Sequence, residues 1–242
     1  EVIVNCAAYT AVDNCEKESA LCWQINADGP KHLAQAAERL GSRVIHISTD
    51  YVFDGYKEVP EAYVETDIPN PLCQYGKSKL AGEKMVAEFA SNHVILRTAW
   101  LYSATGKNFL KTMLKLALSD PERELKVVND QYGSLTWSHT LALQIKRILP
   151  SELRGIMHTT AEGYSSWYEA ARYFLDGMNV PYTMSPCTTA EYPTPAQRPT
   201  NSILANRVLL EAGLSIFGSW QEDLDTFIGR YKEQLLNEAK EC

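Results

Sequence analysis

Apolar and polar residues follow two different periods along this chain. Short apolar runs at 2–5, 43–49 and 93–102 are bounded by polar or turn-forming residues, which predicts strands. Between them, apolar residues recur every three or four positions, which predicts helices. One of these helices ends near Leu40, with Gly41 as its stop signal, and another covers 72–89. Strands that alternate with helices are typical of a parallel α/β sheet.

The second half of the chain continues this alternation and then changes in composition. We expect a helix at 108–118, a strand at 124–128, a helix at 138–149 and a last main-sheet strand at 155–160. Pro, Thr and Tyr become frequent over 181–200, and two amphipathic helices close the chain.

These elements predict two structural parts. The first is a Rossmann-like parallel sheet flanked by helices, made from residues 1–103 and 136–161. The second is a smaller C-terminal α+β lobe for the substrate, made from 104–135 and 162–242. Because the chain opens directly on an apolar strand, we expect the sheet to be N-terminally truncated, without its first βαβ unit.

Composition narrows the function classes. The chain has 242 residues, 45% of them hydrophobic, and a formal net charge of −7 without a basic cluster, which argues against nucleic-acid binding. No apolar run reaches the roughly 18 residues that a membrane span requires. The five histidines lie at no metal-ligand spacing, so we expect no metal. The six cysteines lack a CxxC pattern, which predicts reduced thiols and a cytoplasmic protein.

Tyr75 and Lys79 are the strongest candidates for catalysis. Their spacing of four places both side chains on one helix face, and that face becomes apolar one turn later, so the lysine should point inward. A cation about 4 Å from a phenol, at an effective dielectric near 20, favours the phenolate by roughly 4 kcal/mol. That energy corresponds to about three pKa units, which would make Tyr75 a useful proton donor near neutral pH.

Ser48 and Thr49 end the strand at 43–49. Ligands bind at the carboxyl ends of parallel strands, so a hydroxyl there can bond a substrate oxygen while Tyr75 protonates it. The alternative is that Thr49 only caps the loop that follows.

Several motifs in order resemble the extended short-chain dehydrogenase/reductases, and within them the dTDP-4-dehydrorhamnose reductases. They run over nearly the whole chain: "NCAAYTAVDNCE", "STDYVFDG", "PLCQYGKSKLAGE", "ILRTAWLY", "VVNDQYGSLTW", "GYSSWYE" and "QRPTNSIL". The resemblance implies NAD(P)H-dependent reduction of the C4 keto group of dTDP-4-dehydrorhamnose to dTDP-L-rhamnose, in nucleotide-sugar biosynthesis. The implied partner is this nucleotide sugar, and we expect a homodimer.

The resemblance also implies roles for individual residues. Thr49, Tyr75 and Lys79 match the catalytic set, and Lys79 would also hold the nicotinamide ribose. The residues that match cofactor-binding positions are Ala7, Ala8, Tyr9, Asn26, Ser48, Tyr75 and Lys79. Those that match substrate-binding positions are Thr49, Asp50, Tyr51, Trp100 and Arg198. For Trp100, a core aromatic is an equal alternative.

Three features leave alternatives open. Dehydratases of this superfamily carry an Asp–Glu pair where this chain has Asp50–Tyr51, which favours reduction over elimination. A nucleotide-sugar 4-epimerase uses the same Tyr and Lys, and a non-catalytic regulatory subunit, like the methionine adenosyltransferase β subunit, has the same fold. The glycine-rich turn that binds the cofactor pyrophosphate would precede residue 1, so the preference between NADPH and NADH cannot be predicted.

Overall fold

A four-stranded parallel sheet is the centre of the computed structural model, which describes residues 1–240. Its strands lie in the order β1 (Val2–Asn5), β2 (Arg43–Thr49), β3 (His93–Thr98) and β8 (Gly155–His158). Each neighbouring pair is parallel, so the chain must cross over between strands. The parallel α/β sheet predicted from the sequence is therefore confirmed.

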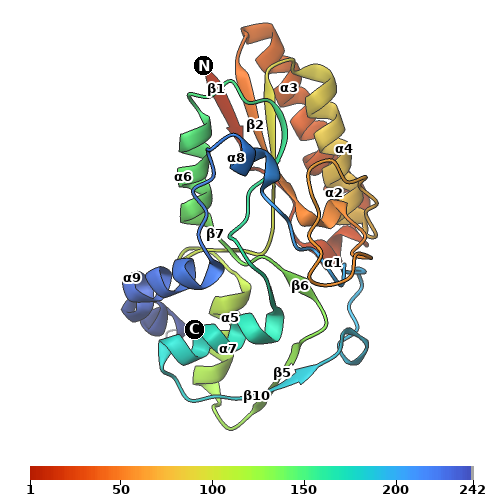
Figure 1. Cartoon of the computed structure of the whole chain (residues 1–242). Helices are drawn as coiled ribbons and strands as arrows, with labels where there is room; N and C mark the ends of the chain where they lie inside the picture. Colours follow the sequence, from red (N-terminus) through yellow and green to blue (C-terminus); the bar gives the residue numbers. More distant parts are fainter. Residues whose placement is uncertain (241–242) are drawn as a thin grey trace.

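Helices cover both faces of this sheet (Figure 1). α3 (Gly29–Leu40) and α4 (Gln74–Phe89) pack on one face. α6 (Ser138–Ile148) and α8 (Arg207–Glu211) pack on the other. Because both faces are covered, the strands are apolar at successive positions instead of alternating with polar residues.

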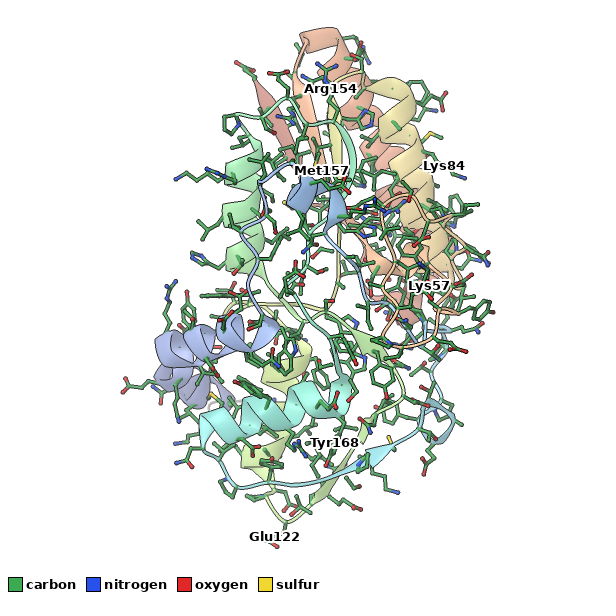
Figure 2. All side chains as sticks on the ribbon, in the orientation of Figure 1. Lys57, Lys84, Glu122, Arg154, Met157 and Tyr168 are labelled. Carbon is green, nitrogen blue, oxygen red and sulfur yellow. The ribbon has the colours of Figure 1, made fainter. Side chains whose placement is uncertain are left out.

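Side chains from alternate strand positions form two layers of core. Toward α3 and α4 the buried residues are Ala34, Ala37, Val44, Val86, Ala90 and Ile95. Toward α6 and α8 they are Ile45, Val94, Leu96, Leu141, Ile148, Met157, Leu209 and Phe217. Figure 2 shows Met157 inside the sheet layer and Lys84 on the outer side of α4, where it is exposed. At the edge of the described sheet, Val2 and Val4 of β1 are each 42% exposed.

A second hydrophobic core lies beyond the carboxyl ends of the strands (Figure 1). It is built by α5 (Phe109–Ser119), α7 (Trp167–Met178) and α9 (Trp220–Lys240). β5 (Glu124–Val128) and β10 (Thr183–Cys187) pair in parallel beside these helices. Leu209 and Phe217, which the predicted division assigns to the lobe, pack on the main sheet instead. The division into two parts stays a prediction.

Short elements connect these two cores. They are α1 (Val12–Cys15), α2 (Ser19–Trp23), the π-helical turn η1 (Gln24–Asp28), the 3-10 turns η2 (Asp50–Val52) and η3 (Thr189–Glu191), and the two-residue strands β4 (Leu101–Tyr102), β6 (Tyr132–Gly133), β7 (Thr136–Trp137) and β9 (Ser165–Ser166).

The structure corrects two expectations about element length. The strand expected over 93–102 is broken at Trp100, whose φ of 48° lies in the left-handed region that bulky side chains rarely adopt. Of the two closing helices, α8 has only 5 residues and α9 has 21. The first difference has a physical reason: the turn at Trp100 takes the chain out of the sheet and into the second core.

Candidate active site

Tyr75 and Lys79 lie on the face of α4 that packs against the end of β2. Tyr75 is 8% exposed and Lys79 is 2% exposed, so the lysine points inward as predicted. The first turn of α4 follows Cys73, whose extended backbone ends the preceding loop. The helix therefore presents a phenol and an ammonium, one turn apart, to the carboxyl end of the sheet.

The ammonium of Lys79 is held by the backbone of β2. Its Nζ donates a hydrogen bond to the carbonyl oxygen of Ile47 at 2.6 Å. Burial lowers the pKa of Lys79 to about 8, although the nearby carboxylate of Glu83 favours the charged form. This lysine is charged at neutral pH but close to its titration range.

The phenol of Tyr75 is a poor acid in this environment. Burial raises the pKa of Tyr75 above its ordinary value, and the nearby Thr49 hydroxyl counteracts part of that rise. The expected net fall in the pKa of Tyr75 is wrong for this structure, because burial raises this pKa by more than nearby groups lower it. Tyr75 therefore stays protonated at neutral pH and is a proton donor rather than a base.

Thr49 and Asp50 form a polar pair beside Tyr75. The Thr49 hydroxyl donates to Asp50 Oδ1 at 2.9 Å and accepts from the Tyr51 N–H at 3.2 Å, so it does cap η2. Asp50 is 2% exposed and its Oδ2 has no hydrogen-bond partner. Burial raises the pKa of Asp50 to about 6, against hydrogen bonds from Ser202 and Thr49. A buried carboxyl with a free oxygen is available to bind a ligand hydroxyl.

Tyr51 connects this pair to the wall of a cleft. Its ring contacts the Tyr75 ring edge-to-face, with centroids 5.5 Å apart. Burial raises the pKa of Tyr51, and the positive charge of Arg198 counteracts this rise. Arg198 itself is anchored by two bonds to the Asp13 carboxylate, at 2.9 and 3.1 Å. The structure thus brings Tyr51 and Arg198 to one cleft.

Asn26 fixes the turn that follows β1. It is fully buried in η1, accepts from the Tyr9 N–H at 2.8 Å and donates to the Tyr9 carbonyl at 3.1 Å. Its amide also donates to Ser78 on α4 at 3.1 Å. Ala7 and Ala8 in this turn carry small, partly or fully exposed side chains. The small-residue turn is therefore held rigidly beside α4, and its backbone can be approached closely.

Two glycines let α4 pack unusually close to its neighbours. A Cβ atom at Gly76 would lie 2.2 Å from the Tyr51 carbonyl oxygen. A Cβ atom at Gly82 would lie 2.1 Å from the Asn26 carbonyl oxygen. The helix that carries Tyr75 and Lys79 thus touches η1 and η2 through its backbone.

Ser48 does not face the same way as Thr49. Its hydroxyl donates to Glu83 Oε1 at 2.5 Å, inside a buried cluster with Arg97. The Ser48 hydroxyl is thus engaged with Glu83, and the cofactor contact of Ser48 stays a prediction. The sequence offered two signals for this cluster. Glu83 comes four residues after Lys79, and Arg97 interrupts an apolar strand.

Trp100 belongs to an aromatic cluster that packs against the second hydrophobic core. Its ring stacks on Trp167 with centroids 3.5 Å apart and an interplanar angle of 8°. Phe109 contacts Trp167 from another side, at 4.6 Å between centroids. Gly133 leaves room for the Trp100 indole, since a Cβ there would lie 2.5 Å from it. Sequence reasoning missed Trp167 and Phe109, because their partners come from distant segments.

An open cleft of about 910 Å³ runs from two of the predicted substrate residues, Tyr51 and Arg198, to the second core. Its lining residues include Asp13, Tyr51, Phe109, Arg123, Lys126, Gln131, Trp167, Tyr192, Thr194 and Arg198. Three of them are cations, and four are aromatic: Tyr51, Phe109, Trp167 and Tyr192. A cleft with these side chains can bind an anionic ligand that also has a flat ring.

Several other features of residues 1–240 bear on the predicted class. Five cysteines in this range are free thiols: Cys6, Cys15, Cys22, Cys73 and Cys187. Cys242 lies outside the described residues. Within the described chain, no helix combines the length and apolar character needed to cross a membrane. The same residues contain no cluster of three or more His, Cys, Asp or Glu suited to a metal ion.

Comparison with known proteins places this geometry in a family. The family model described as "RmlD substrate binding domain" matches residues 1–233. The dTDP-4-dehydrorhamnose reductase of Sinorhizobium fredii is 46% identical over 217 residues, which cover 84% of this chain and 71% of that protein.

Two solved structures have the same fold over almost the whole chain. A dTDP-4-dehydrorhamnose reductase from Clostridium acetobutylicum superposes with a TM-score of 0.92 and 42% identity, over 96% of this chain and 81% of that one. The Bacillus anthracis enzyme, solved in complex with NADP, gives a TM-score of 0.91 and 39% identity, over 95% and 80%. Together with the family model, these similarities show that the chain belongs to the RmlD substrate-binding-domain family.

Proposed function

We propose that this protein reduces the C4 keto group of dTDP-4-dehydrorhamnose to the alcohol of dTDP-L-rhamnose, with NADPH or NADH as reductant. The observation that carries the proposal is the placement of Tyr75 and Lys79. Both are buried on one face of α4, next to Thr49 and the carboxyl end of the sheet. The relatives named as dTDP-4-dehydrorhamnose reductases support the choice of substrate.

The residues around the turn after β1 fit a nicotinamide cofactor. Ala7 and Ala8 leave their backbone accessible, Asn26 holds that backbone in place, and Lys79 points toward the same strand ends. Ala7, Ala8, Tyr9, Asn26, Tyr75 and Lys79 would hold the cofactor, and the NADP complex of the Bacillus anthracis relative supports this assignment. When bound, the reduced nicotinamide supplies the hydride that C4 of the sugar receives.

Tyr75 supplies the proton that completes the reduction. As the C4 carbonyl gains an electron pair, its oxygen becomes basic and takes the phenolic proton of Tyr75. Burial keeps this phenol protonated until then. The Lys79 ammonium then stabilises the phenolate by its charge. The Thr49 hydroxyl, which donates to Asp50 in this structure, would turn to donate to the same substrate oxygen and so orient the carbonyl toward Tyr75.

The cleft wall supplies binding rather than chemistry. Arg123, Lys126 and Arg198 can neutralise the diphosphate of the nucleotide, because guanidinium and ammonium groups form strong charge-assisted bonds to phosphate. Trp167 and Phe109 offer apolar faces to a sugar or a base. Asp50, with one carboxyl oxygen free, is placed to accept a hydrogen bond from a sugar hydroxyl.

The assay is direct. The protein is mixed with dTDP-4-dehydrorhamnose and either NADPH or NADH, and the product is identified by chromatography and NMR. We expect one dTDP-L-rhamnose for each cofactor oxidised. An epimerase would interconvert nucleotide sugars without net oxidation, and a regulatory subunit would show no turnover and would bind a methionine adenosyltransferase. Either result would replace the proposal.

A cytoplasmic location and a homodimer are also part of the proposal. The biosynthetic reaction uses a soluble nucleotide sugar and a soluble cofactor, which supports the first. Light scattering coupled to gel filtration measures the mass in solution, and a monomeric mass would contradict the proposed homodimer.

A further inference from the structure

A buried ion pair lies one helical turn beyond Lys79. Glu83 and Arg97 are 2% and 1% exposed, and they form two parallel bonds: Arg97 Nε to Glu83 Oε1 at 2.9 Å and Nη2 to Oε2 at 2.7 Å. The Ser48 hydroxyl also donates to Oε1. Three donors therefore hold this carboxylate in one orientation.

Strand β2 holds two residues of α4, Lys79 and Glu83. Ile47 accepts from the Lys79 ammonium and the next residue, Ser48, donates to Glu83. Lys79 and Glu83 are four residues apart, so their side chains lie on one face of the helix. These bonds thus fix how α4 is rotated about its axis and where it lies along β2, next to the proposed catalytic lysine.

Burying two charges is costly, and well-packed apolar residues in their place are often at least as stable. The groups that face Lys79 suggest what the pair does. They are Glu83 on α4, Cys22 on α2, Cys6 after β1 and His46 on β2. Burial lowers the pKa of His46 to about 3, so its ring is neutral. Glu83 is the one carboxylate in this set.

We propose that Glu83, clamped by Arg97 and Ser48, is a positioning residue that keeps the Lys79 ammonium charged and in place beside Tyr75. The inference rests on the proposed reductase function, in which that charge stabilises the Tyr75 phenolate. Without Glu83, the effect of burial on the pKa of Lys79 would be opposed less, and the lysine would lose its proton at lower pH.

The test uses a double variant, Glu83→Gln with Arg97→Met, which removes both charges and leaves no buried cation unpaired. We expect the alkaline limb of its kcat profile to move to lower pH by about one unit. The matched control is Glu88→Gln, which removes a carboxylate from an exposed position of the same helix and should leave the profile unchanged. A folded double variant with a wild-type profile would overturn the inference.

A second measurement does not depend on activity. The titration of Lys79 is followed by NMR of protein labelled at the lysine ε-carbon, with the signal assigned from the Lys79→Arg spectrum. The midpoint should fall in the double variant and stay constant in Glu88→Gln. If the double variant does not fold, Ser48→Ala decides, since it removes one of the three donors that hold the Glu83 carboxylate and should give a smaller shift in the same direction. An unmoved midpoint overturns the inference, whereas a wild-type protein without reductase activity overturns only the proposed function.

Discussion

The two walls of the site are built from opposite kinds of surface. On the α4 side, Tyr75, Lys79 and Glu83 are buried, and their polar atoms are largely bonded to β2 or β3. On the side of the second core, Arg123 and Lys126 line an open cleft, and their side chains make no hydrogen bond to the other described residues. The difference indicates that reactivity and affinity are set by different residues. On one wall, burial shifts the pKa values of the reacting groups. On the other, free charges remain available to bind the ligand.

The strongest way to break this comparison is Tyr75→Phe. The ring still fills its space, so the midpoint of thermal unfolding should change little. Without the phenolic proton, kcat should fall by at least about a hundredfold. Steady-state kinetics with dTDP-4-dehydrorhamnose measure the loss, and calorimetry checks the fold. Activity within a few-fold of wild type would remove Tyr75 from the chemistry.

The next largest effect concerns Asp50 and stability. Burial raises the pKa of Asp50 to about 6, so the folded protein binds a proton that the unfolded chain releases near its ordinary value of 3.8. The stability from this group is therefore present at low pH and is lost as pH rises through about 6.

Asp50→Asn should remove this loss. Relative to wild type, the free energy of unfolding should gain roughly 2 to 3 kcal/mol between pH 4 and pH 7. Urea unfolding at a series of pH values measures the difference, with Asp120→Asn, at an exposed position after α5, as the control. Parallel curves for wild type and Asp50→Asn would mean that the folded-state pKa is ordinary.

A smaller effect is expected on the cleft wall. Lys126→Met keeps the stem but deletes a charge that lines the cleft, so KM for the nucleotide sugar should rise about tenfold. The change should leave kcat within about twofold, because the reacting atoms lie on the other wall. Lys84→Met, on the outer side of α4 in Figure 2, is the control. A fall in kcat without a change in KM would show that Lys126 affects the reaction step and that the two walls do not have separate roles.

The smallest effect sharpens the role of Thr49. Thr49→Ser keeps the hydroxyl that donates to Asp50, so kcat should remain within about threefold of wild type. Thr49→Val has the same shape without the hydroxyl and should cost about tenfold. Equal activity of the two variants would show that Thr49 only caps η2.

The sequence predicted the parallel sheet because its strands are apolar at successive positions, a pattern that depends on local composition alone. It predicted the inward lysine for the same reason, since one helical face carries both Lys79 and Val86. It did not reveal the direction of Ser48, because the twist at the end of a strand decides which neighbour a side chain meets. The pKa of Tyr75 was also missed, because it depends on burial by segments far away in the chain.

Trp100 shows the same limit. A strand pattern continues through "RTAWLY", yet the backbone turns at Trp100, where Gly133 and Trp167 accommodate the indole. Both partners lie more than thirty residues away in sequence. The motif predicted that Trp100 faces the sugar, and this stays a prediction. The stack of Trp100 on Trp167 could be found only from the three-dimensional structure.

The backbone contacts of Gly76 and Gly82 have a consequence for directed evolution of this enzyme. Alanine is the better helix former, so a library selected for stability alone would be expected to replace glycines within α4. At these two positions even one methyl group would collide with a carbonyl oxygen of η2 or η1. Variation that reshapes substrate choice must therefore come from the opposite wall, because the face of α4 that contacts η1 and η2 tolerates almost no change in outline.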